Sequence, residues 1–128
     1  MRTILVADDN RLSRELLRDI LETADHRVVE ARDGGEVLRL VEEAVPDLIL
    51  LDLEMPVKDG YTVLEQIQTH PRFSKIPVVA VTAKAMRNDR ERAMAAGFRD
   101  YITKPVSTSD LRKLVEQLLD PLGKGAGR

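Results

Sequence analysis

The sequence predicts one α/β domain, in which helices cover both faces of a parallel β-sheet. Strand-like and helix-like segments alternate five times along 128 residues, the length of one ordinary domain. Three of the strand-like segments, residues 4–7, 48–51 and 78–81, are continuous apolar runs and not alternating ones. Such runs are typical of strands that are buried on both faces, and these strands are parallel because helices connect them.

The other two strands are predicted at residues 28–31 and 101–102. Residues 28–31 include Glu30 and are more polar than the apolar runs, which favours a place at an edge of the sheet. Five strand–helix units predict a flavodoxin-like three-layer sandwich, whose five-stranded sheet has the order 2-1-3-4-5.

Two helices are predicted in the first half of the chain. The first follows a cap at Asn10, and the second opens at Asp33, where Glu36 provides a capping-box partner. Their apolar residues recur at helical spacing and are expected to face the core: Leu12, Leu16, Leu17, Ile20 and Leu21 in the first helix, and Val37, Leu38 and Val41 in the second.

Three more helices are predicted in the second half. The fourth runs from about Ala85 to a C-terminal cap at Gly97, with Met86 and Met94 expected in the core. The fifth begins at Ser107 and ends before Pro121. The apolar stripes are Val63, Leu64 and Ile67 in the third helix, and Leu111, Leu114, Val115, Leu118 and Leu119 in the fifth.

Composition limits the class of protein. The chain has no cysteine, and its 20 Lys and Arg residues against 22 Asp and Glu residues give a net charge of -2, so neither a disulfide framework nor direct DNA binding is expected. No signal peptide or membrane-spanning stretch is recognisable, which indicates a cytoplasmic protein without membrane contact. Residues 1–121 are expected to form the domain, and residues 122–128 a flexible C-terminal tail.

Five polar side chains follow four of the predicted strands. They are Asp8, Asp9, Asp52, Thr82 and Lys104. The carboxyl ends of parallel strands share one rim, where the ligands of α/β sheets bind. Three carboxylates on that rim would repel one another without a cation, and an all-oxygen donor set favours Mg²⁺. Asp52 stands alone after a central strand and is the predicted nucleophile that attacks phosphorus. Lys104 and Thr82 are expected to donate hydrogen bonds to the oxygens of the transferred phosphoryl group.

The motifs that carry these residues resemble a known family, the CheY-like receiver domains of two-component response regulators. The motifs are Asp8-Asp9, Asp52 followed by Met55-Pro56 and Asp59-Gly60, Thr82-Ala83, and Lys104-Pro105. The resemblance implies that Asp52 is the phosphoacceptor, that Asp8, Asp9 and Asp52 hold Mg²⁺ with the backbone carbonyl of Glu54, and that Lys104 contacts the phosphoryl group. It implies a phosphohistidine donor on a histidine kinase or a histidine phosphotransfer protein. In this family a cis peptide is frequent at the position of Lys104-Pro105.

The resemblance also implies a switch. Thr82 moves toward the new phosphoryl oxygens, and the ring of Tyr101 turns inward, which changes the face made by the fourth helix, the fifth strand and the fifth helix. A downstream protein target is expected on that face. Four arginines suggest an acidic or dimeric counterpart, so a monomer or a weak dimer is expected: Arg87, Arg90, Arg92 and Arg99.

Two residues depart from the commonest pattern of the family. Glu54 follows Asp52 by two positions, and Lys84 follows Thr82 by two. Both positions flank the path of the attacking water, so we hypothesise that the two side chains pair across the mouth of the pocket and modulate the lifetime of the phosphoryl group.

Other functions remain open at this point. Each site residue judged singly is a common cap, turn or surface residue, and only their coincidence on one rim indicates a site. A phosphatase of the haloacid dehalogenase type also uses a strand-end aspartate, but it needs a second aspartate where Glu54 stands. A flavin protein needs a phosphate-binding loop where Asp8-Asp9 stands. A receiver working without phosphorylation, or a fragment of a larger regulator or hybrid histidine kinase, is a further alternative. The prediction is a signalling switch that assists its own phosphorylation and dephosphorylation, and not a metabolic enzyme.

Overall fold

Five parallel strands form the sheet in the order β2-β1-β3-β4-β5, which confirms the order expected from the sequence. The computed structural model describes residues 2–84 and 86–119 of the chain. Its strands are β1 (Thr3–Ala7), β2 (Arg27–Ala31), β3 (Leu48–Leu51), β4 (Val78–Thr82) and β5 (Asp100–Thr103). The more polar β2 lies at an edge, as predicted, and the apolar β1, β3 and β4 lie inside the sheet.

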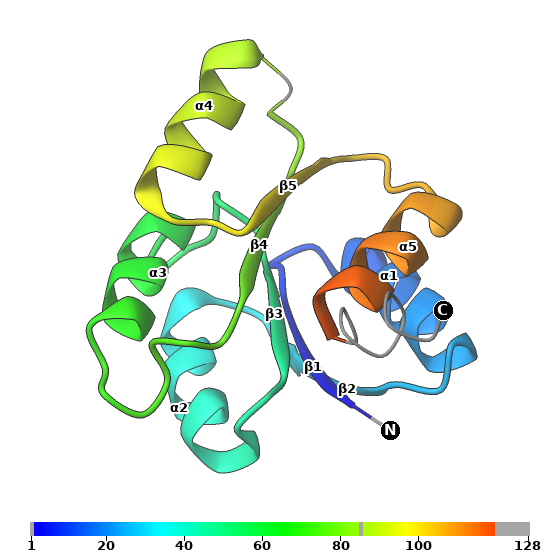
Figure 1. Ribbon diagram of the computed structural model, residues 1–128, viewed down its shortest axis with the longest axis horizontal. Helices are drawn as coiled ribbons and strands as arrows, with labels where there is room; N and C mark the ends of the chain where they lie inside the picture. Colours follow the sequence, from blue (N-terminus) through cyan, green and yellow to red (C-terminus); the bar gives the residue numbers. More distant parts are fainter. Residues whose placement is uncertain (1, 85, 120–128) are drawn as a thin grey trace.

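Helices cover both faces of this sheet. They are α1 (Arg11–Thr23), α2 (Gly34–Ala44), α3 (Gly60–Gln68), α4 (Arg87–Ala96) and α5 (Thr108–Leu119). Helices α1 and α5 lie on one side, and α2, α3 and α4 on the other, with the strands between them (Figure 1). None of the helices in the described part of the chain is long and apolar enough to cross a membrane.

The period of two along each strand divides the buried side chains between two cores. On β1, Ile4 and Val6 belong to the core under α1 and α5, whereas Leu5 and Ala7 belong to the core under the other three helices. The residues of β3 are divided in the same way. Because each fully buried Ile or Leu side chain stabilises the fold by about 1.5–3 kcal/mol, the two cores fix the register and hold the strand ends at one level.

Polar residues fix the helix ends near the site. Side-chain oxygens of the predicted caps accept hydrogen bonds from amides three residues on: Asn10 from Ser13, Asp33 from Glu36, and Ser107 from Asp110. Helix α4 ends at Gly97, whose φ of 116° suits glycine. Ala85, Pro121 and the predicted tail over residues 122–128 lie outside the described residues, and α4 itself begins at Arg87.

Two expectations about buried apolar residues are wrong. Leu12 and Leu16 of α1 are 75% and 46% exposed, although the rest of the predicted stripe is buried. The leucine spacing gives the helical period, but it does not say which flank of a broad stripe reaches the sheet. Met86 and Met94, expected in the core, are also exposed, because Ala93 is the buried residue of α4.

Candidate functional site

The carboxyl ends of the strands bring the predicted rim residues together. Asp8 and Asp52 directly follow Ala7 and Leu51, which are paired residues of β1 and β3. The main-chain amide of Asp52 donates to the carbonyl of Ala7 at 2.9 Å, so the pairing of the two strands extends to the phosphoacceptor candidate. Thr82 ends β4, and Lys104 follows β5. The sheet therefore places all five predicted side chains at the rim formed by the carboxyl ends of its strands.

Asp8, Asp52 and Lys104 form a buried hydrogen-bonded group. The Lys104 Nζ atom lies 2.6 Å from Asp8 Oδ2 and 3.3 Å from Asp52 Oδ2. The remaining oxygens accept main-chain donors: Asp8 Oδ1 from Asn10 at 2.8 Å, and Asp52 Oδ1 from Glu54 at 3.1 Å. Asp8 is 1% exposed and Asp52 is 6% exposed. Every oxygen of the two buried carboxylates therefore has a donor, which fixes their direction.

Burial and charge act on the ionisation of this group. Burial raises the pKa of Asp52 and the charge of Asp8 adds to the increase, against the opposing effects of the Glu54 amide and Lys104. Burial lowers the pKa of Lys104, but its hydrogen bonds and charge interactions with Asp8 and Asp52 outweigh burial and raise the pKa overall. Lys104 is therefore held as an ammonium ion, while ionised Asp52 lies in a site that disfavours its charge.

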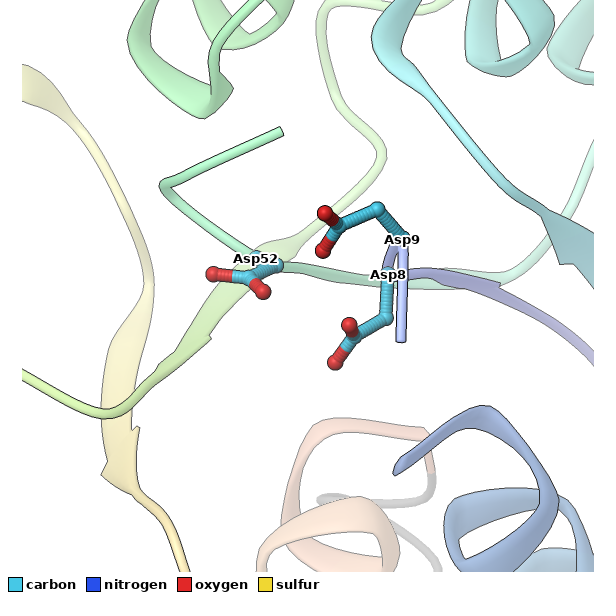
Figure 2. A group of neighbouring side chains, drawn as sticks. All are labelled: Asp8, Asp9 and Asp52. Atoms are coloured by element: carbon cyan, nitrogen blue, oxygen red, sulfur yellow. The ribbon is translucent and has the colours of Figure 1, made fainter. Parts of the chain in front are cut away.

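Asp9 completes a group of three carboxylates. Asp8, Asp9 and Asp52 each offer an oxygen within 4.8 Å of the others. Figure 2 shows the three side chains gathered around one space beyond the strand ends. Asp9 is exposed, and its carboxylate has no hydrogen-bond donor among the described residues. Three carboxylates facing one ammonium leave an excess of negative charge, and hard oxygen donors of this kind suit Mg²⁺.

Thr82 and Tyr101 both contact Lys84. The Thr82 hydroxyl is fully buried and accepts a hydrogen bond from the Lys84 amide at 3.3 Å. The Tyr101 hydroxyl donates to the Lys84 carbonyl at 2.6 Å, and its ring is buried, so the ring already lies inward in this structure, in the position that the resemblance assigns to the phosphorylated state. Thr82 and Tyr101, the two predicted switch residues, are thus both hydrogen-bonded to the main chain of Lys84 in the loop after β4.

Glu54 and Lys84 follow Asp52 and Thr82 by two residues each and lie close together. Their side chains form an ion pair, with 3.6 Å between Lys84 Nζ and Glu54 Oε2. Both line a pocket of about 200 Å³, together with Asp59 and Asp89. The Lys84 side chain is 46% exposed and the Glu54 side chain 62% exposed, so the pair contributes little to stability. The geometry agrees with the pairing expected from their positions in the sequence.

The predicted motifs Asp59-Gly60 and Lys104-Pro105 adopt special backbone arrangements next to the site. Gly60, the first residue of α3, approaches the main chain that follows β3 so closely that a Cβ atom there would lie 2.7 Å from the Asp52 carbonyl oxygen. The Asp59 side chain caps α3 by accepting from the Thr62 amide. The Lys104–Pro105 peptide bond is cis, as expected from the resemblance.

Sequence reasoning missed two charged residues beside the site, Arg14 and Glu30. The Arg14 side chain crosses from α1, and its Nη1 atom donates to the main-chain carbonyl of Asp8 at 2.8 Å. Its Nε atom donates to Glu30 Oε1 of β2 at 3.1 Å. A signal was available in the sequence, because Arg14 precedes the buried Leu17 and Leu21 by three and seven positions and so lies on the buried side of α1.

Three of the four arginines expected to face a counterpart have side-chain partners within the chain: Arg87, Arg90 and Arg92. Arg87 pairs with Glu91 at 3.2 Å, and Arg90 pairs with Asp100 at 3.4 Å. The Arg92 guanidinium lies 4.5 Å from the centre of the Tyr61 ring. These interactions reduce the charge that α4 offers to an acidic or dimeric counterpart.

Comparisons with known proteins show the family of the chain. The family model described as "Response regulator receiver domain" matches residues 4–116. The polar-differentiation response regulator DivK of Brucella anthropi is 35% identical over 118 residues, which cover 92% of this chain and 96% of DivK.

Two solved structures add to the comparison. The receiver domain of the sensor histidine kinase PA1611 from Pseudomonas aeruginosa PAO1, solved with a magnesium ion in its active-site cleft, is 30% identical with a TM-score of 0.85. The match covers 92% of this chain and 97% of that one. The chemotaxis protein CheY4 of Vibrio cholerae is 25% identical with a TM-score of 0.86, over 93% of this chain and 99% of CheY4.

Proposed function

The chain belongs to the response regulator receiver family of two-component signalling, and from this premise we propose that Asp52 accepts a phosphoryl group and thereby switches a protein-binding surface. The observation that carries the proposal is the Lys104 ammonium, which lies between the buried carboxylates of Asp8 and Asp52. The receiver domain is proposed to span residues 1–121.

The transfer is a displacement at phosphorus. A carboxylate oxygen of Asp52 attacks the phosphorus of a phosphohistidine on a histidine kinase or a histidine phosphotransfer protein. An O–P bond forms while the N–P bond breaks, and the imidazole leaves with the electron pair and is protonated by solvent. Lys104 donates to the phosphoryl oxygens, and its raised pKa keeps it charged for that role. The exposed Leu12 and Leu16 offer the donor an apolar surface beside Lys104.

The acidic group fits a divalent cation. We assign Mg²⁺ to Asp8, Asp9 and Asp52, with the backbone carbonyl of Glu54 as a further ligand, because all of these are hard oxygen donors and the carboxylates converge. When bound, the ion offsets the negative charge that the carboxylates and the phosphoryl oxygens bring together. Water hydrolyses the acyl phosphate by attacking phosphorus, which releases inorganic phosphate and restores the Asp52 carboxylate.

The switch passes through the loop after β4. When the Thr82 hydroxyl turns toward the phosphoryl oxygens, it loses its hydrogen bond from the Lys84 amide. The hydrogen bond from the Tyr101 hydroxyl to the Lys84 carbonyl then determines the new position of Lys84. The change reaches the face of α4, β5 and α5, where we place the downstream protein target.

Glu54 and Lys84 have a modulatory role in this proposal. We place their ion pair in the path of a water molecule that approaches the phosphoryl group from solvent, because Glu54 and Lys84 lie two residues beyond Asp52 and Thr82. The pair shields the acyl phosphate and lengthens its lifetime.

Incubation with acetyl phosphate and Mg²⁺, read by intact mass, tests the proposal. We expect one phosphoryl adduct that depends on the metal and is absent in Asp52→Asn. An adduct of equal yield on Asp52→Asn, or without divalent metal, would contradict the assignment. Steady release of phosphate from a phosphomonoester would favour a phosphatase instead.

A further inference from the structure

Arg14 is a charged side chain on the buried side of α1. It is 9% exposed and lies among the residues of that helix that pack on the sheet, including Leu17 and Leu21. Burying a guanidinium without partners costs several kcal/mol, so its partners account for its presence. The Leu17 side of α1 would otherwise carry an apolar residue at this position.

The partners of Arg14 lie on β2 and at the residue that follows β1. Its Nη1 atom donates to the Asp8 carbonyl at 2.8 Å, and its Nε atom donates to Glu30 Oε1 at 3.1 Å. The second oxygen of Glu30 accepts from Arg18, which also pairs with Glu22 on the exposed side of the helix. Arg14 is therefore fixed between β2 and the end of β1, with Glu30 compensating its charge.

The Asp8 carbonyl is a sensitive point of the site. It belongs to the peptide unit that joins Asp8 to Asp9, so its direction sets the planes from which both carboxylates project. On β1, the Asp8 amide still pairs with Ala31, but the chain turns toward α1 directly afterwards. The Arg14 guanidinium donates to this carbonyl and fixes the orientation of the peptide, which lies just beyond the last hydrogen bonds of the sheet.

We propose that Arg14 is a positioning residue for the metal-binding carboxylates, acting through the Asp8–Asp9 peptide. The inference rests on the proposed function, since it concerns the same divalent cation site. Three carboxylates with oxygens within 4.8 Å repel one another, and the exposed Asp9 is free to turn toward solvent. Holding the peptide keeps Asp9 directed at the site before a cation binds, and so reduces the cost of ordering it.

Charge alone predicts the opposite behaviour. A guanidinium near a cation site repels the cation, so a purely electrostatic Arg14 would weaken Mg²⁺ binding, and its removal would tighten it. The ion pair with Glu30 reduces that repulsion while leaving the hydrogen bond to Asp8 intact. The direction of the change in Mg²⁺ affinity therefore separates positioning from charge.

Calorimetric titration with Mg²⁺ alone tests the inference. Arg14→Met removes the donors but keeps the length of the stem, and we expect its Kd for Mg²⁺ to rise about tenfold. Arg14→Lys keeps one donor and should fall between Arg14→Met and the wild type. Arg18→Met is the matched control, because Arg18 binds the same Glu30 from the same helix but does not contact Asp8, and it should stay within about twofold of the wild type.

A second measurement distinguishes positioning from loss of fold. In the acetyl phosphate reaction, Arg14→Met should need more Mg²⁺ for half-maximal phosphorylation but reach nearly the wild-type rate at saturation. Circular dichroism without metal reports the folded fraction. If Arg14→Met is unfolded, Arg14→Lys takes its place, since it keeps the positive charge but loses the forked donor geometry of the guanidinium, and a severalfold weaker Mg²⁺ affinity is expected.

Equal or tighter Mg²⁺ binding by folded Arg14→Met would overturn the inference, as would wild-type affinity in Arg14→Lys where Arg14→Met is unfolded. A rate at saturating Mg²⁺ that falls in proportion to the folded fraction would also overturn it. Failure of the proposed function is distinguishable, because the wild-type chain itself would then bind no Mg²⁺ or form no Asp52 adduct.

Discussion

The hydroxyl of Tyr101 donates a 2.6 Å hydrogen bond to the main-chain carbonyl of Lys84. The amide of the same residue donates to the Thr82 hydroxyl, so one residue of the loop after β4 connects the site to β5. Thr82 and Tyr101 are therefore connected through a single residue, and a movement of Thr82 would reach Tyr101 without a longer chain of contacts.

Tyr101→Phe should uncouple the surface from the site. The variant loses one buried hydrogen bond, so the free energy of unfolding should fall by about 1 kcal/mol, while the rate of phosphorylation by acetyl phosphate stays near that of the wild type. The amide signals of α4 and β5 in ¹H–¹⁵N spectra should shift less on phosphorylation. Tyr61→Phe is the control, since the Tyr61 hydroxyl has no hydrogen bond within residues 2–84 and 86–119. Equal spectral responses in both variants would refute the coupling.

Asp52→Asn should stabilise the metal-free protein at neutral pH. Because burial raises the pKa of Asp52, its ionised form is less favourable in the folded chain than in the unfolded chain. The penalty is absent below the ordinary value of 3.8, grows as the pH rises toward the raised pKa, and is complete above it. We expect the free energy of unfolding to increase by about 1 kcal/mol at pH 7, and the gain to vanish in acid.

Denaturant unfolding between acid and neutral pH measures this effect. Asp19→Asn, at an exposed carboxylate of α1, is the control and should show no such gain. Mg²⁺ should stabilise the wild type more than Asp52→Asn, because the ion compensates the charge that the variant lacks. A variant that is less stable than the wild type at pH 7 without metal would contradict the assigned cost of ionisation.

The sequence predicted the strands and the rim well, for a local reason. A continuous apolar run is compatible with a doubly covered strand, and the residue after such a run must lie at the carboxyl end of the strand, so Asp8 and Asp52 could be placed without knowing any contact. It was harder to predict which leucines of α1 are buried against the sheet. Leu12 and Leu16 share the period of the buried leucines, yet they lie outside the core.

Arg14 shows why the remainder was not predictable from local pattern. A buried arginine is compatible with the fold only because Glu30, sixteen residues away on β2, compensates its charge. Periodicity describes one element at a time, whereas this pair depends on how two elements meet.

Removing the Glu54–Lys84 pair should shorten the life of the acyl phosphate. The double variant Glu54→Ala, Lys84→Ala opens the mouth of the site, and we expect hydrolysis about threefold faster, equivalent to about 0.6 kcal/mol of activation free energy. Loss of the adduct is followed by intact mass after acetyl phosphate is removed. Stability should change by less than about 1 kcal/mol, because the pair is largely exposed. The two single variants complete a double-mutant cycle, and unchanged hydrolysis in the double variant would count against the pair.

Gly60→Ala should disturb the phosphoacceptor from behind. The new Cβ atom would lie 2.7 Å from the Asp52 carbonyl oxygen and 2.8 Å from Leu53 Cα, and neither main-chain atom can rotate away. Overpacking of this kind costs about 1–3 kcal/mol, and a displaced Asp52 should be phosphorylated about tenfold more slowly or worse. Gly35→Ala is the matched control in α2, since its Cβ would meet side-chain atoms of Asp33 and Val57 at 3.2 and 3.4 Å. There the helix gains the better propensity of alanine, so stability should hold or rise. Phosphorylation rates and unfolding curves of the two variants decide the point: if Gly60→Ala matches Gly35→Ala in both, the main chain of Asp52 is not constrained by the start of α3.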